Sequence, residues 1–172
     1  MILNPAPAQP LSNDLLRRVY LLTPNETEAE LLTGLAVNNT AAAAKAADAL
    51  LARGVENVII TLGARGALVA GRQGRGLVEG FKVKPVDTTG AGDVFNGTLA
   101  VALAEGKPLL EAARFASAAA ALSVTRLGAQ TSAPMRKEID QLLTANNGPA
   151  GVSGKRARLG RRNPDASARI AM

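Results

Sequence analysis

Segments of helical spacing alternate with short apolar runs along the first 145 residues. Apolar positions that recur every three to four residues predict helices, and a glycine follows several of them. The predicted helices cover residues 11–18, 40–53, 109–124 and 135–143, with two more that end at Gly34 and at Gly106. Short continuous or alternating apolar runs predict strands at 19–22, 58–62, 67–70 and 81–86, after an apolar start at 2–10 that runs into a proline-rich turn.

Strands that alternate with helices indicate a layered α/β domain with a largely parallel sheet. One domain is the natural expectation for 172 residues. From Gly148 onward the chain changes to Gly, Pro, Ser, Arg and Ala without any period. We therefore expect a folded part at 1–147 and a basic, disordered tail at 148–172.

The composition excludes several classes of chemistry. The chain has no Cys and no His, so we expect no disulfide, no thiolate metal site and no Ser/His hydrolase. One Tyr and three Phe are too few for the stacking surfaces of single-strand nucleic-acid binders. Catalysis then depends on carboxylates, hydroxyls, Lys and Arg, backbone amides and hard cations such as Mg²⁺.

Positive charge is concentrated in the predicted tail. Residues 1–147 carry 14 Lys and Arg against 13 Asp and Glu, whereas 148–172 carry six against one. Such a tail could attach nucleic acid nonspecifically, but no reading motif accompanies it, and a solvated tail is the favoured interpretation. Without a run of about 18 apolar residues or a basic signal-peptide region, the sequence favours a cytoplasmic protein that does not span a membrane.

The most informative motif covers residues 87–93. Gly90 and Gly92 flank Ala91 directly before a predicted helix, so free backbone N–H groups can converge there on an anion such as a phosphoryl group. Asp93, in the first turn, could accept the proton of an attacking hydroxyl. The alternative is an ordinary glycine-rich turn in which Asp93 only interacts with the helix dipole.

Asn25 and Glu28 form a second candidate site. Spaced i and i+3 at the start of a helix, they could together hold a hydrated Mg²⁺. The favoured alternative is plain capping of that helix within a solvated acidic turn.

Two loops carry weaker signals. The turn at 61–66 follows a strand at a place where nucleotides often bind in α/β sheets, although any tight hairpin has the same composition. The loop at 123–132 could wrap a monovalent cation together with the Asp87 side chain and the Thr89 carbonyl, or could simply be a polar loop after a helix.

Taken together, these motifs resemble the ribokinase family of sugar and nucleoside kinases. Residues 87–97, DTTGAGDVFNG, closely resemble the C-terminal signature of that family. TPNETEAE at 23–30, TLG at 61–63 and GAQ at 128–130 follow the family's order and spacing, as does NPAP at 4–7.

The resemblance implies a three-layer αβα sandwich that transfers the γ-phosphoryl group of Mg·ATP to the 5-hydroxyl of D-ribose, with K⁺ as an activating cation. Asp93 matches the catalytic base, which also contacts the sugar, and Gly90, Ala91 and Gly92 match the anion hole. The matching ATP-binding positions are Asn25, Thr61, Leu62, Gly63, Ala64, Arg65, Gly66, Gly92, Asp93 and Ser117. The matching metal positions are Glu28 with Asn25 for Mg²⁺, and Asp87, Thr89, Ser123, Arg126, Gly128 and Ser132 for K⁺.

The resemblance covers residues 1–145 and extends only to the second half of the family's domain. The opening strands, the sugar-binding glycines and acidic residues, and the β-lid through which members form homodimers have no counterpart here. We therefore expect a partial sheet with an exposed edge, weak stability, and impaired or no activity for the chain alone, as from a truncated gene. A kinase for another sugar or nucleoside and a non-catalytic nucleotide-binding fragment are the alternatives.

Overall fold

The computed structural model describes residues 1–72 and 74–146, so the predicted tail lies outside the described residues. Within them, five strands form one sheet in the order β1-β2-β3-β4-β5. The strands are β1 Ile2–Leu3, β2 Leu21–Leu22, β3 Asn57–Thr61, β4 Gly66–Gly71 and β5 Gly74–Glu79. The helices are α1 Asn13–Leu16, α2 Glu26–Thr33, α3 Thr40–Ala52, α4 Ala91–Ala104, α5 Leu109–Ser123 and α6 Arg136–Ala145, with a 3₁₀ turn, η1, at Gly63–Arg65.

The sheet is mixed rather than largely parallel. β1, β2 and β3 pair in parallel, with Leu21 opposite Asn57, whereas β3, β4 and β5 pair antiparallel, with Ile59 opposite Val69. The reason lies in the connections. A single 3₁₀ turn joins β3 to β4, and so short a link can only reverse the chain, whereas a parallel neighbour needs a crossover of a dozen or more residues.

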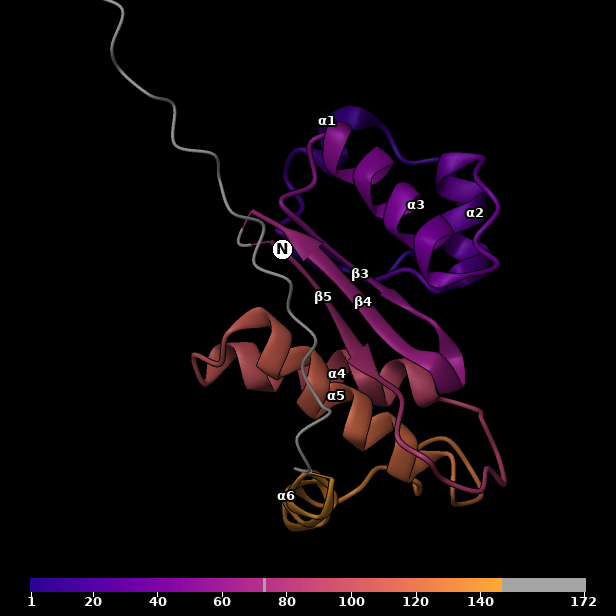
Figure 1. Cartoon of the computed structure of the whole chain (residues 1–172), viewed down its shortest axis with the longest axis vertical. Coiled ribbons are helices and arrows are strands. Elements are labelled where there is room, and N and C mark those ends of the chain that lie inside the picture. Colours follow the sequence, from indigo (N-terminus) through magenta and orange to yellow (C-terminus); the bar gives the residue numbers. More distant parts are fainter. Residues whose placement is uncertain (73, 147–172) are drawn as a thin grey trace, which may run out of the picture.

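Successive residues of the central strands point to opposite faces of the sheet and build two separate cores. Val58 and Ile60 pack with Leu50 beneath α1–α3, whereas Ile59 packs with Phe95 on the side of α4–α6. Figure 1 shows α1, α2 and α3 over one face of the sheet and α4, α5 and α6 over the other. The predicted three-layer αβα arrangement is confirmed.

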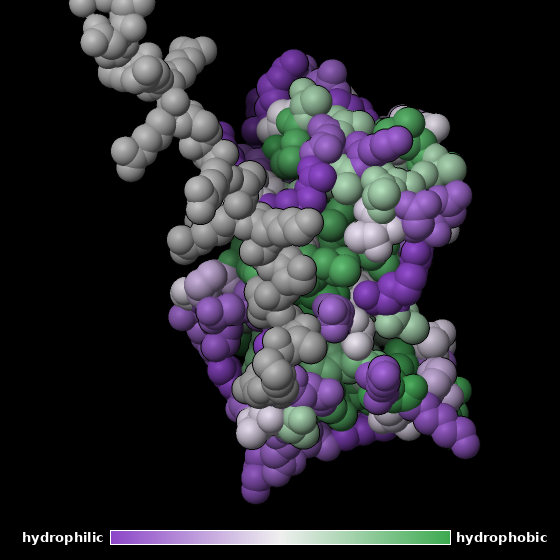
Figure 2. All heavy atoms as spheres, viewed as in Figure 1, coloured by the Kyte–Doolittle hydropathy of each residue, from purple (hydrophilic) through white to green (hydrophobic). Residues whose placement is uncertain are grey.

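Alanine allows the helices to approach one another and the sheet closely. Ala43, Ala46 and Ala47 of α3 are fully buried, and α5 buries a row of five alanines against α4 and the sheet. Figure 2 shows hydrophobic residues in the hollow between the two helical layers and hydrophilic residues over their outer surfaces. Among residues 1–72 and 74–146, no helix combines the length and the apolar content that a bilayer crossing requires.

The region between residues 71 and 90 differs from the prediction. β5 was not predicted, because Gly-Arg-Gly at its start is not typical of a strand and only two apolar residues follow. These two, Leu77 and Val78, face opposite cores. The strand predicted at 81–86 is wrong: these residues belong to no strand of the sheet. β5 has already taken the place next to β4, and Pro85 has no N–H with which to pair.

Candidate active site

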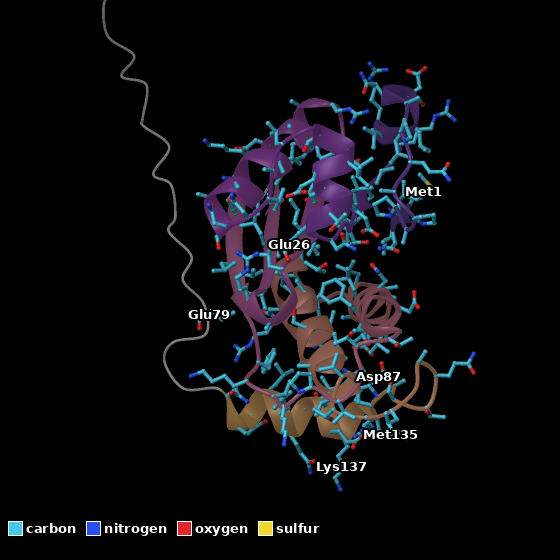
Figure 3. The ribbon with its side chains drawn as sticks, turned by 90° about the vertical axis from the view of Figure 1, so that its right-hand side faces the viewer. Met1, Glu26, Glu79, Asp87, Met135 and Lys137 are labelled. Carbon is cyan, nitrogen blue, oxygen red and sulfur yellow. The ribbon has the colours of Figure 1, made fainter. Side chains whose placement is uncertain are left out.

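A cavity of about 520 Å³ opens at the end of the sheet where β3 meets η1. It lies between the two helical layers, with the start of α2 on one side and parts of α4 and α5 on the other. In Figure 3, which faces this end of the sheet, Glu26 lies above and Asp87 below. Eight of the candidate residues line the cavity, namely Asn25, Thr61, Gly63, Ala64, Gly66, Ala91, Gly92 and Ser117.

The first turn of α4 presents backbone N–H groups beside the cavity. Gly90 caps the helix in the left-handed region at φ 75°, and a Cβ there would lie 2.9 Å from that of Ala129. The N–H groups of Gly92 and Asp93 have no acceptor among the described residues. A Cβ on Gly92 would meet no atom within 4 Å, so this position faces open space. Free N–H groups beside open space are what the predicted anion site requires.

Asp93 lies in that same turn but does not line the cavity. Its side chain is exposed, and no hydrogen bond or ion pair holds it within the described residues. A carboxylate in this position keeps its lone pairs free for a proton donor that approaches from solvent or from a ligand.

Asn25 and Glu28 form a capping box at the start of α2. The Asn25 side chain accepts a hydrogen bond from the N–H of Glu28, and Glu28 Oε2 accepts one from the N–H of Asn25, both at 2.8 Å. The capping interpretation is therefore confirmed for this pair. Asn25 still lines the cavity and pairs with Thr61 in an isolated bridge, whereas Glu28 is 9% exposed and lies outside the lining.

The turn at 61–66 is held tightly against the end of β5. A Cβ at Gly66, where φ is 99°, would lie 1.9 Å from the carbonyl oxygen of Val78, and one at Gly80 would lie 2.0 Å from that of Ala64. These approaches require glycine and fix the turn that forms one wall of the cavity. Leu62 points into the α1–α3 core, so its side chain is absent from the lining.

Arg65 also lies outside the lining. Its Nη2 donates to the Glu26 carboxylate, and its Nη1 donates to the carbonyl of Asn38 at 3.3 Å. The guanidinium thus joins η1 to the start of α2 and to the loop before α3.

Asp87 ties together the two loops for which a cation was predicted. Its carboxylate accepts hydrogen bonds from the N–H of Thr89 at 2.9 Å and from the N–H of Gly128 at 3.0 Å. These hydrogen bonds, chiefly that from Thr89, hold the pKa of Asp87 below its ordinary value. The carbonyl of Val124 accepts from the N–H groups of Val86 and Asp87, which draws the same loops together.

The other three candidates on the 123–132 loop have local partners. Ser123 donates to the carbonyl of Ala120 at 2.8 Å, and Ser132 donates to that of Ala129 at 3.0 Å; both serines are buried. Arg126 pairs with Glu138 of α6. Within the described residues no group of three or more acidic side chains is arranged to hold a metal ion, so a cation here would depend on carbonyl and hydroxyl oxygens.

Two sets of residues at this end of the sheet were missed by the sequence reasoning. The first is an apolar wall of the cavity, and the part of it at 81–85 alternates apolar with polar residues in the sequence as a strand does. It consists of Phe81, Val83, Pro85, Ala120, Ala121 and Val124.

The second missed set is a chain of side-chain hydrogen bonds from the sheet to α4. Thr23, after β2, donates through Oγ1 to Asn96 Oδ1 at 2.7 Å, and Asn96 Nδ2 donates to the carbonyl of Gly92 at 2.9 Å. Asn4 Nδ2 donates to the carbonyl of Thr23 at 3.0 Å. The available signal was that Asn4 and Thr23 each follow a short apolar strand, where side chains at the carboxyl edge of a sheet converge.

Comparison with known proteins matches residues 1–136 to the pfkB family of carbohydrate kinases. Ribokinase from Haemophilus influenzae is 50% identical over 143 residues, which cover 83% of this chain and 47% of that protein. Ribokinase from Bacillus subtilis is 43% identical over 144 residues, with coverage of 84% and 46%.

Two solved structures share the fold. Ribokinase from Thermotoga maritima superposes with a TM-score of 0.76 at 48% identity, over 83% of this chain and 48% of that one. Arabidopsis thaliana ribokinase complexed with ribose and ATP gives 0.78 at 37% identity, over 83% and 46%. The chain spans about half the length of the relatives it matches. With the matched residues and the shared fold, the chain belongs to the pfkB family of carbohydrate kinases.

Proposed function

We propose that this chain carries the ATP-binding and catalytic side of a ribokinase, which transfers the γ-phosphoryl group of ATP to the 5-hydroxyl of D-ribose. One observation carries the proposal. A single cavity gathers Asn25, the turn at 61–66 and Gly92, which are far apart in the sequence, around the free N–H groups of α4. The relatives named ribokinase support the choice of ribose.

In this proposal Asp93 is the general base. The carboxylate accepts the proton of the ribose hydroxyl while the neighbouring N–H groups of Gly92 and Asp93, and the turn formed by Gly90 and Ala91, stabilise the charge on the phosphoryl group. A positioned base contributes about 10²–10⁴-fold to such a step, and aligned amides add a comparable electrostatic contribution. Ser117 and the apolar wall would border the adenine base, for which the cavity offers a nonpolar surface.

The residues present fit a hydrated Mg²⁺. Mg²⁺ usually takes one or two protein oxygens beside phosphates and water, and Glu28 keeps its second carboxylate oxygen without a partner in the described residues. Glu28 and Asn25 would hold the ion, which when bound neutralises phosphate charge.

The two loops joined by Asp87 fit a K⁺ ion, because they bring carbonyl and hydroxyl oxygens together behind the anion-binding turn. The proposed ligands come from Asp87, Thr89, Ser123, Arg126, Gly128 and Ser132, with Arg126 contributing only its carbonyl. Their role would be to stiffen the turn at Gly90, which packs on Ala129 of the same loop.

The remaining ribose contacts and the dimer-forming β-lid belong, in this proposal, to the half of ribokinase that these residues do not resemble. The folded unit would be 1–147 with the basic segment as an appendage, and the reaction would take place in the cytoplasm. A kinase for a related sugar or nucleoside is the nearest alternative, because the residues that select the sugar belong to the half of ribokinase that this chain does not resemble.

Two experiments test the proposal. Calorimetric titration of the chain with Mg·ATP should show one-to-one binding that persists in Asp93→Asn, because only the proton acceptor is lost. In the second experiment, a chimera is made in which residues 1–145 of this chain replace the corresponding segment of the Haemophilus influenzae ribokinase. The chimera should form ADP in a ribose- and K⁺-dependent manner, and Asp93→Asn should abolish this, whereas Asp140→Asn on exposed α6 should not.

The outcomes separate the candidate functions. Binding of Mg·ATP with an inactive chimera would favour the non-catalytic nucleotide-binding protein. Absence of binding by the 172-residue chain would contradict the proposal. Full activity of the Asp93→Asn chimera would show that another group is the base.

A further inference from the structure

Among the described residues that line the cavity, one side chain is ionisable, and it is acidic. Glu26 lines the cavity from the first turn of α2, and the other described lining residues are uncharged. In Figure 3 Glu26 lies where the α1–α3 layer gives way to the α4–α6 layer. For a site proposed to take a polyphosphate, a carboxylate at the wall opposes the ligand, so its charge must influence which ligands bind.

Arg65 balances this carboxylate from outside the cavity. Its guanidinium donates to Glu26 and to the Asn38 carbonyl, so it is anchored at two points. The Arg65 and Glu26 side chains are 44% and 33% exposed, so water screens the pair only in part. Glu26 therefore belongs to the cavity lining, whereas its guanidinium partner, Arg65, does not.

We propose that the Glu26–Arg65 pair makes the cavity discriminate between nucleotides by charge, favouring the magnesium complex over the free polyphosphate. The inference rests on the proposed nucleotide site. Coulomb energy scales with ligand charge, and free ATP carries about twice the negative charge of Mg·ATP near neutral pH. The Glu26 carboxylate therefore repels free ATP more strongly than Mg·ATP. The Arg65 guanidinium weakens this repulsion, so that Mg·ATP still binds.

Glu26→Gln removes the opposing charge and keeps the size of the side chain. We expect the Kd of Mg·ATP to fall about threefold and the Kd of free ATP, measured with EDTA, to fall about tenfold. Twice the ligand charge doubles the Coulomb energy, which squares the ratio of the dissociation constants. Adenosine binding should not change. Arg65→Gln should act in the opposite direction, weakening free ATP more than Mg·ATP.

Asp48→Asn is the matched control. Asp48 pairs with Arg75, both are exposed, and neither lines the cavity, so the same change in net charge occurs away from the site. Its nucleotide affinities should stay within about twofold of the unchanged chain. Raising the salt to about 1 M should remove most of the difference that Glu26→Gln produces, because the Debye length falls to about 3 Å.

Each outcome of these titrations either supports or overturns the inference. Equal shifts for free ATP, Mg·ATP and adenosine, or no shift in either Glu26→Gln or Arg65→Gln, would overturn the inference while leaving the nucleotide site intact. Binding of neither ATP form by the unchanged chain would overturn the proposed function and this inference with it. A thermal melt of each variant separates a charge effect from a loss of folding, and the Arg65→Gln variant keeps the test valid if Glu26→Gln weakens the start of α2.

Discussion

Replacement of Thr23 by valine tests the hydrogen-bond chain that joins the sheet to the first turn of α4. The change is isosteric and removes only the hydroxyl, which donates to Asn96 Oδ1 at 2.7 Å and lies 3.4 Å from the carbonyl oxygen of Leu3. Thr23 is 2% exposed and Asn96 is half-buried, so water reaches Asn96 Oδ1 only in part once its donor is lost. An acceptor left unsatisfied costs about 1–3 kcal/mol, and we expect a loss of about 2 kcal/mol in the free energy of unfolding.

The assay is thermal and urea unfolding followed by circular dichroism. For a domain of this size about 2 kcal/mol corresponds to a fall in Tm of about 6 °C. Thr33→Val is the matched control, because its hydroxyl makes only local hydrogen bonds: it donates to the Ala29 carbonyl of its own helix and accepts from the exposed N–H of Leu35. Its loss should be about 0.5 kcal/mol or less.

A double-mutant cycle with Asn96→Ala isolates the contact between the two residues. We expect a coupling free energy of about 1 kcal/mol, because the two side chains share one hydrogen bond. A coupling below about 0.3 kcal/mol, or equal losses in Thr23→Val and Thr33→Val, would refute the role of Thr23 as a link between β2 and α4.

Three further predictions concern the turns and the loops. Gly92→Val should weaken Mg·ATP about tenfold or more in calorimetry with little change in Tm, since the side chain would enter open space at the amide turn; an unchanged Kd would place the phosphates elsewhere. Gly66→Ala should cost about 3 kcal/mol or more, because its Cβ would meet a carbonyl, whereas Gly97→Ala on exposed α4 should be neutral or stabilising; equal effects on Tm would contradict this. Hydrogen bonds from Thr89 lower the folded-state pKa of Asp87, so its stabilisation is present above the ordinary value of 3.8 and is lost as pH falls through the folded pKa. Unfolding midpoints from pH 5 to pH 2 should therefore decline less in Asp87→Asn, and an identical decline would show that these hydrogen bonds do not persist in solution.

The elements that the sequence predicted correctly are those whose signal is local. α3 has helical spacing and an Asn39 cap, and Gly34 ends α2 in the left-handed region at φ 71°. Each of these depends on residues within a few positions of one another. β5 and the segment after it were predicted wrongly, because which of two apolar stretches pairs with β4 depends on the partner strand and not on the stretch itself.

The candidate site was predictable as a set of motifs but not as an arrangement. The glycines around Ala91 indicated an amide turn because backbone freedom is a property of the residues themselves. The capping box also follows from residues three apart. The Glu26–Arg65 pair joins residues 39 apart, and no periodicity in the chain connects them.

The sequence by itself determined the layered α/β class, the family, most helix boundaries and the glycine turn that begins α4, because spacing, capping and glycine placement act locally. The tertiary structure alone decided the mixed sheet, the apolar wall of the cavity, and the link from Thr23 to α4. It also decided that Arg65 faces Glu26 and that Asp87 holds two loops together. These features depend on contacts between distant segments, which form only when burial of the two cores brings the ends of the strands together.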